Sequence, residues 1–172
     1  MKNNLFDSLI GLKLTNIIFQ PTAGIISPTN MFVLNFKKGK EFYSLHAFTF
    51  LRIMQDNRIL LCSSDEFVNN DLHLMDSDGT IEDSIIGHNI NNVKKLSRNA
   101  TVTQATLFDC GDVQIKLSNN VIIDIIIDST IDGFEYYRLF DYNSSAPHMV
   151  VENVNGEITG IFSPDQNSES LK

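Results

Sequence analysis

The chain has 172 residues, and its 21 acidic residues outnumber its 13 lysines and arginines, giving a formal net charge of −8. This balance argues against nucleic-acid binding, because phosphate recognition requires clustered lysine and arginine. No apolar run approaches the roughly 20 residues that a membrane-spanning helix needs, and the first residues lack the pattern of a secretory signal. We therefore expect a soluble, cytoplasmic protein that contacts neither nucleic acid nor membrane.

The first predicted element is a short helix within residues 3–10, capped by Asn3 or Asn4 and followed by a strand. Residues 7–17 (DSLIGLKLTNI) recur in the second half as residues 83–93 (DSIIGHNINNV). Such self-similarity is typical of a duplicated structural unit. In both copies we expect the Asp-Ser pair to cap a turn and the glycine, Gly11 or Gly87, to relieve strain at the entry to a strand.

A strand, a tight turn and a second strand are predicted next in each half. Alternating apolar residues favour strands, and the turns hold residues that tolerate positive φ. The two predicted hairpins span residues 32–45, with a turn at 37–40, and residues 113–125, with a turn at 118–120. The match continues with residues 50–53 against 136–139, and with 58–61 against 148–151.

These elements predict an α+β protein of mostly antiparallel β structure, built as a tandem pseudo-repeat of a helix-or-turn, strand and hairpin unit with short helices. The second copy opens with a short helix at residues 81–86, where Thr80 and Asp83 resemble a capping box. At this length we expect one domain over residues 1–172, made of repeats at about 3–66 and 79–153, with a flexible tail at 163–172.

Catalytic and metal-binding motifs are absent from the sequence. There is no C-x-x-C, no H-E-x-x-H, no nucleophile elbow and no phosphate-cradling loop. Residues 76–79 (DSDG) lack the flanking ligands of a calcium loop, because Leu74 and Ile85 stand where acidic residues are required, so we interpret these residues as a turn. Cys62 and Cys110 are expected to be reduced thiols. We therefore predict no enzymatic activity, no cofactor and no metal.

Three polar residues lie in apolar surroundings. The repeat register places His46 opposite Ile127, on a face shared with Phe42 and Phe48, so a hydrogen-bonded structural role is favoured over that of a general base. Arg52 and Arg138 fall at matching positions, where a guanidinium must find a carboxylate or carbonyl partner. We interpret both arginines as scaffold residues, with an interface anchor as the alternative.

An acidic stretch in the second half is interspersed with aromatic residues. Its simplest interpretation is a solvated face, and its alternative is a surface that attracts a basic partner. The residues that we predict to bind a partner are Asp124, Asp128, Asp132, Phe134, Glu135, Tyr136, Tyr137 and Asp141. The acidic segments 65–66 and 71–78 are further candidates.

In size, acidity and strand-rich composition without catalytic motifs, the chain resembles the immunity proteins of bacterial contact-dependent toxin systems. This resemblance implies a cytoplasmic inhibitor that binds and neutralises a cognate toxin domain, often a basic nuclease, by charge complementarity or by strand addition. One alternative is a ligand-binding or enzymatic domain, with a pocket between the repeats lined by His46, Cys62, Arg52 and Arg138. Another is a structural homodimer formed by pairing of exposed strand edges.

Overall fold

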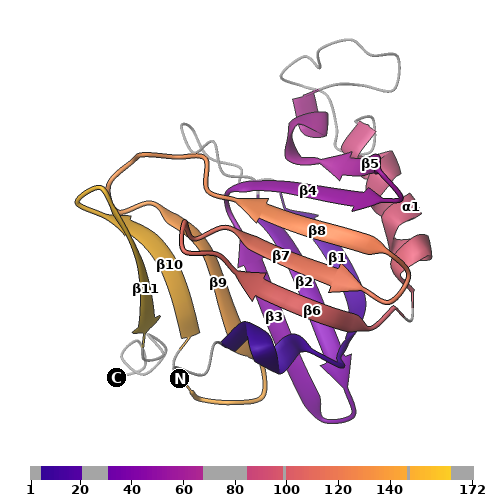
Figure 1. Ribbon diagram of the computed structural model, residues 1–172, viewed down its shortest axis with the longest axis horizontal. Coiled ribbons are helices and arrows are strands. Elements are labelled where there is room, and N and C mark those ends of the chain that lie inside the picture. The colour runs from indigo at the N-terminus through magenta and orange to yellow at the C-terminus, as the bar shows by residue number, and fades with distance from the viewer. Residues whose placement is uncertain (1–4, 21–30, 68–84, 99, 147, 164–172) are drawn as a thin grey trace, which may run out of the picture.

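Two antiparallel sheets form the protein in the computed structural model, which describes residues 5–20, 31–67, 85–98, 100–146 and 148–163 (Figure 1). Sheet A has the strand order β1-β2-β3-β9-β10-β11, and sheet B has the order β5-β4-β8-β7-β6. The prediction of a protein dominated by antiparallel strands is confirmed.

Each half of the chain contributes strands to both sheets. The first half consists of η1 (Leu5–Leu9), β1 (Lys13–Gln20), β2 (Met31–Lys38), β3 (Glu41–Ala47), β4 (Phe50–Gln55), β5 (Arg58–Cys62) and η2 (Ser63–Phe67). The second half consists of α1 (Ile85–Ser97), β6 (Val102–Leu107), β7 (Val113–Leu117), β8 (Val121–Ile126), β9 (Glu135–Asp141), β10 (His148–Val154) and β11 (Glu157–Ser163).

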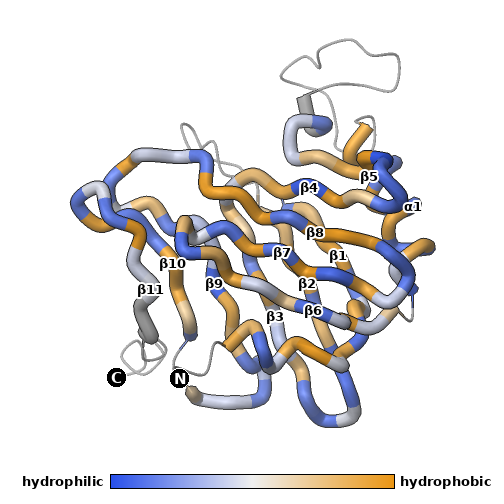
Figure 2. The backbone as a smooth tube through the Cα atoms, viewed as in Figure 1, coloured by the Kyte–Doolittle hydropathy of each residue, from blue (hydrophilic) through white to orange (hydrophobic). Residues whose placement is uncertain are grey.

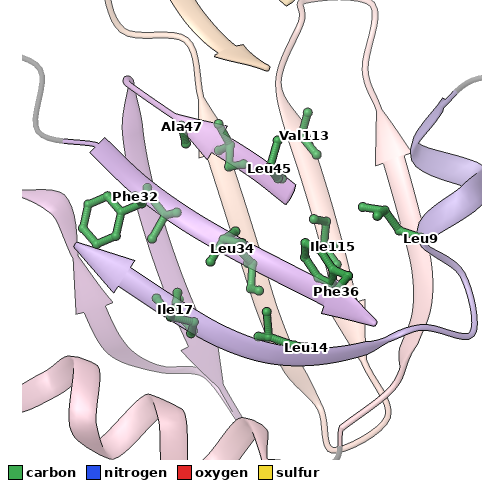
Figure 3. Packing of buried hydrophobic residues seen from close by; sticks show 14 of the residues in the cluster. Leu9, Leu14, Ile17, Phe32, Leu34, Phe36, Leu45, Ala47, Val113 and Ile115 are labelled. Carbon is green, nitrogen blue, oxygen red and sulfur yellow. The ribbon is translucent and has the colours of Figure 1, made fainter. Parts of the chain in front are cut away.

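Alternation of apolar and polar residues explains the core. Phe32, Leu34 and Phe36 of β2 are fully buried, and Asn35 between them points to the other face of sheet A. Side chains of β2 and β3 face Val113 and Ile115 of β7 across the space between the sheets (Figure 3). The same alternation appears as orange and blue bands along the strands in Figure 2. Burial of each side chain of this size stabilises the folded state by about 1.5–3 kcal/mol relative to leaving it exposed.

The helix α1 corrects the prediction for the second repeat. Residues 88–93 were expected to form a strand like that of residues 12–17, but they lie within a helix that extends to Ser97. Ile86, Ile90 and Val93 are buried at helical spacing, and this face packs against β1 and β5. Gly87 therefore lies inside the helix. Only Gly11 has the positive φ (85°) expected at the entry to a strand.

Several predicted features lie outside the described residues. They are the cap at Asn3 or Asn4, the capping box of Thr80 and Asp83, the turn at 76–79, the acidic segment 71–78 and the tail after residue 163. The short opening helix is present as the 3-10 helix η1.

The two sheets join along one side of the molecule. Lys13 of β1 forms an antiparallel bridge with Thr101, just before β6. Around this bridge, the amide of Leu14 donates to the carbonyl of Ala100 (3.2 Å), and the amide of Val102 donates to that of Leu12 (2.8 Å). The sheets thus form a sandwich that is closed at the β1 and β6 edges.

The strand order is the same in both sheets when β1 to β5 are matched with β6 to β10. Three strands of one half are followed by two of the other: β1-β2-β3-β9-β10 in sheet A, and β6-β7-β8-β4-β5 in sheet B. The sequence matches from residue 32 onward fall on elements matched in this way. The opening match does not, because it pairs residues of β1 with residues of α1.

Local irregularities also recur between the matched strands. Both β1 and β6 contain a β-bulge, at Thr15 and Thr103. Each bulged threonine donates its hydroxyl proton to a carbonyl of the neighbouring strand, Thr15 to Asn35 (3.0 Å) and Thr103 to Lys116 (3.1 Å). A bulge leaves one residue unpaired and bends the strand. The strands β1 and β6 are therefore bent at matching positions, and a matching hydrogen bond accompanies each bend.

Candidate protein-binding surface

Three of the residues predicted to bind a partner are buried, which corrects the prediction for them. Asp124 is 6% exposed, Tyr136 is 1% exposed and Tyr137 is fully buried. The Tyr136 hydroxyl donates to the carbonyl of Ser129 (2.6 Å), and the Tyr137 hydroxyl donates to that of Gly111 (2.7 Å). Burial raises the pKa of Tyr137, so it remains a neutral donor. Their aromatic rings belong to the core.

The Asp124 carboxylate instead anchors an ion pair on sheet B. Arg52 of β4 lies opposite Asp124 of β8, and its Nη2 and Nε atoms lie 2.8 and 3.2 Å from the carboxylate. Gln114 of β7 donates a third hydrogen bond (3.0 Å). Because a buried carboxylate is costly without such partners, this arrangement supports the interpretation of Arg52 as a scaffold residue.

Arg138 holds the matching position in sheet A, but its partners differ. It lies opposite His46 and forms an ion pair with Glu135 of its own strand. In the matched strand order His46 therefore corresponds to Asp124, not to Ile127 as the sequence register predicted. The half-buried His46 also contacts the hydroxyl of Ser44 (3.1 Å). Burial lowers the pKa of His46 to about 4, and the positive charge of Arg138 adds to this effect.

The four residues of the alternative pocket do not line one cavity. His46 and Arg138 are paired in sheet A, whereas Arg52 and Cys62 are paired in sheet B. In each sheet they alternate with core residues, such as Leu45 and Leu51, so they lie on the outer faces with the core between them. Cys62 and Cys110 are free. Among the described residues, no group of three or more potential metal ligands is found.

Three connections meet at the side of the molecule formed by β9, β10 and β11, away from α1 (Figure 1). They are residues 108–112 between β6 and β7, residues 127–134 between β8 and β9, and the turn 155–156 between β10 and β11. The amide of Gly133 donates to the carbonyl of Asn153 (2.8 Å), and the amide of Asn155 donates to the Asp132 carboxylate (2.5 Å). Gly111 packs against the side chains of Ile127 and Ile158. We call residues 108–112, 127–134 and 155–158 the acidic end.

Large apolar side chains are exposed at the acidic end. Phe108 is 45% exposed, Ile131 is 57% exposed and Ile158 is 43% exposed. They come from three segments that are distant in the sequence. Exposed apolar groups gathered within a polar rim are typical of protein-interaction sites.

The charge of the acidic end has one sign. Its three connections contain Asp109, Asp112, Asp128 and Asp132 but no lysine or arginine. Asp112 accepts a hydrogen bond from the amide of Ile127 (2.9 Å), and Asp128 accepts one from the hydroxyl of Thr49 (2.6 Å). Within the described part of the chain, the Asp109 carboxylate accepts no hydrogen bond, and it is exposed. These carboxylates produce a negative potential around the exposed apolar groups.

Only some of the residues predicted to bind a partner lie at the acidic end. Asp128 and Asp132 are exposed at the acidic end, where Phe134 is half-buried. Glu135, the first residue of β9, is half-buried and paired with Arg138. Asp141 lies at the opposite end of β9, near the turn between β2 and β3, because the next residue, Tyr142, donates its amide to Phe42. The prediction missed Phe108, Asp109, Ile131 and Ile158, since only the folded chain brings them together.

Among the described residues, no helix has both the length and the apolar character needed to cross a lipid bilayer. Comparison with known proteins found no matching family model, no matching curated protein and no matching solved structure.

Proposed function

We propose that this protein is a cytoplasmic immunity protein that binds a basic toxin domain through the acidic end and thereby neutralises it. The observation that carries the proposal is the combination of Phe108, Ile131 and Ile158, all exposed, with four aspartates, Glu157 and no basic residue at the acidic end. Exposed apolar side chains supply contact area, and the carboxylates accelerate and orient the approach of a basic partner.

The first experiment is growth rescue. The product of the adjacent upstream reading frame, or its C-terminal part, is expressed in a test cell with and without this protein. Arrest that this protein relieves, with copurification of the two, supports the proposal. If the neighbouring product arrests growth and this protein neither relieves the arrest nor binds the product, the inhibitor proposal fails for that pair.

Charge reversal then tests whether the acidic end is the contact surface. The double variant D109K/E157K reverses two exposed carboxylates at the acidic end. The matched control D7K/E41K makes the same change in net charge on η1 and at the start of β3. We expect the first variant to weaken binding at least about tenfold, mainly through the association rate, and the control to weaken it about twofold or less. Equal losses would place the contact elsewhere.

We also propose that the two halves are copies of one structural unit. The matched strand order, the bulges at Thr15 and Thr103, and a shared hydrogen bond before the first strand support this. In the first half the amide of Leu12 donates to the carbonyl of Leu9 (3.0 Å), and in the second half that of Ala100 donates to Ser97 (2.9 Å). By this criterion η1 corresponds to the last turns of α1.

A further inference from the structure

A groove of about 290 Å³ separates the start of β1 from the C-terminal turn of α1. Its lining residues are Lys13, Leu14, Thr15, Asn16, Lys94, Ser97 and Arg98. The groove is lined by residues of β1 and α1, and α1 lies at the opposite side of the molecule from β10 and β11 (Figure 1). It is therefore separate from the acidic end.

The groove concentrates positive charge in a protein whose net charge is −8. Lys13, Lys94 and Arg98 line it, and no carboxylate does. Among the described residues, the ion pairs are those of Arg52 with Asp124 and of Arg138 with Glu135, so none of the three groove cations is neutralised in this way. Three like charges around one groove repel each other, and an anion between them would relieve this repulsion.

Capping of α1 does not require these cations. Basic residues near a helix C-terminus often compensate the partial negative charge of the last carbonyls. In α1, neutral donors already bind the last two carbonyls: the Asn119 side chain binds that of Leu96 (2.7 Å), and the Ala100 amide binds that of Ser97 (2.9 Å). One turn earlier, the Ser97 hydroxyl donates to the carbonyl of Val93 (2.7 Å).

The fold does not require the three groove cations either, as comparison of the two halves of the molecule indicates. The Lys13 and Thr101 bridge and the matched hydrogen bonds of Leu9 and Ser97 align the two halves residue by residue in this region. The places of Lys13, Lys94 and Arg98 are then held by Thr101, Phe6 and Ile10. Both halves thus form the matched turn before their first strand, although η1 is a 3-10 helix and α1 an α-helix, and no basic residue occupies the three matched positions.

We propose that this groove binds a phosphate or diphosphate group of a small molecule. Arg98 supplies the planar donor group that pairs with two phosphate oxygens, and the two lysines supply compact positive charge. The side chain of Asn16, which makes no hydrogen bond within the described chain, adds a neutral donor at the bulge in β1. The groove volume is near the lower limit for small-molecule sites, which suits a phosphoryl group better than a whole nucleotide.

Calorimetric titration of the full chain with pyrophosphate tests this proposal, at low ionic strength and without any toxin. We expect saturable binding with one site per chain. Lys94→Gln and Arg98→Gln should each weaken it about tenfold, corresponding to about 1.4 kcal/mol. The matched control is Lys95→Gln, because Lys95 is an exposed neighbour on the same helix turn that does not line the groove. We expect this control to change the affinity less than about twofold.

Two results would overturn the proposal. One is the absence of saturable binding by the wild-type chain at millimolar pyrophosphate. The other is an equal loss of affinity in Lys94→Gln and Lys95→Gln, which would indicate attraction to the general positive charge of α1. Thermal unfolding of each variant verifies that the substitution leaves the fold intact. Since the titration contains no toxin, its outcome is independent of the immunity proposal.

Discussion

Gly111 has a backbone conformation and a packing environment that together exclude a side chain. Its φ is +85°, and a Cβ atom at this position would lie 2.5 Å from a side-chain carbon of Ile127 and 2.9 Å from one of Ile158. Both isoleucines lie in segments that meet at the acidic end. A single residue without a side chain therefore lets three distant parts of the chain approach closely.

Gly111→Ala should lower the free energy of unfolding by about 2–4 kcal/mol, combining backbone strain with overpacking. Gly133→Ala is the matched control, because Gly133 also has a positive φ (74°) but has no atoms within 4 Å of its added Cβ. We expect the control to cost about 1 kcal/mol. Urea unfolding measures both values, and equal losses would show that packing at Gly111 is not tight.

His46 should make the protein less stable in acid. Its folded pKa is about 4, below the ordinary value of 6.5, because burial and Arg138 disfavour the charged form, although Glu135 opposes this. The unfolded chain therefore binds the extra proton first as the pH falls. The stability that neutral His46 provides is complete above pH 6.5 and is lost between pH 6.5 and 4.

Denaturant unfolding at several pH values tests this effect. His46→Gln should lose less stability than the wild type between pH 6.5 and 4. The control is His88→Gln, which removes an exposed imidazole from α1. Parallel losses in the wild type and His46→Gln would exclude His46 as the cause.

At the scale of single elements, the sequence predicted the strands well and the helix poorly. The hairpin of β2 and β3 follows from alternating residues such as Phe32 and Leu34, because burial on one face of a strand imposes a period of two. For α1, the similarity of residues 83–93 to residues 7–17 suggested a strand, although Ile86, Ile90 and Val93 have helical spacing. Identical residues in short segments do not fix a conformation when tertiary packing favours another.

A proline substitution distinguishes the helix from the strand that was predicted. Asn91 is exposed in the middle of α1. Asn91→Pro should lower the free energy of unfolding by about 3 kcal/mol, because proline removes a helical hydrogen bond and clashes with the preceding turn. Asn91→Ala should be neutral or slightly stabilising, since alanine has the higher helix propensity. A small effect of proline, measured by circular dichroism during urea unfolding, would contradict the helix.

At the scale of the whole molecule, the sequence could suggest matched halves but not their exchange of strands. Both sheets contain strands from both halves, since β9 pairs with β3 and β4 pairs with β8. Hydrophobic alternation specifies which face of a strand is buried but not which strand lies beside it. For the same reason, the sequence reveals the acidic residues between positions 124 and 141, but it does not reveal the surface that some of them share with Phe108 and Ile158.

The exchange of strands predicts how separated halves behave. Residues 1–75 and 76–172, produced as two chains in one cell, should copurify, because each completes the sheets of the other. Either half alone should be unfolded or should associate with itself. As a control, the chain is divided instead into residues 1–48 and 49–172. This cut lies between β3 and β4 and divides the strands unequally. Monomeric, cooperatively folded halves, detected by size-exclusion chromatography and urea unfolding, would contradict this arrangement.

The same exchange of strands has a consequence for synthesis on the ribosome. When β5 has emerged, β3 still lacks its neighbour β9, and β4 still lacks its neighbour β8. Neither sheet then has all of its strands. Apolar residues such as Leu45 and Leu51 therefore remain accessible to solvent until β8 and β9 have been translated. A protein of this topology depends on late translation to complete its first sheet, and its nascent chain is exposed to chaperones and proteases for most of its synthesis.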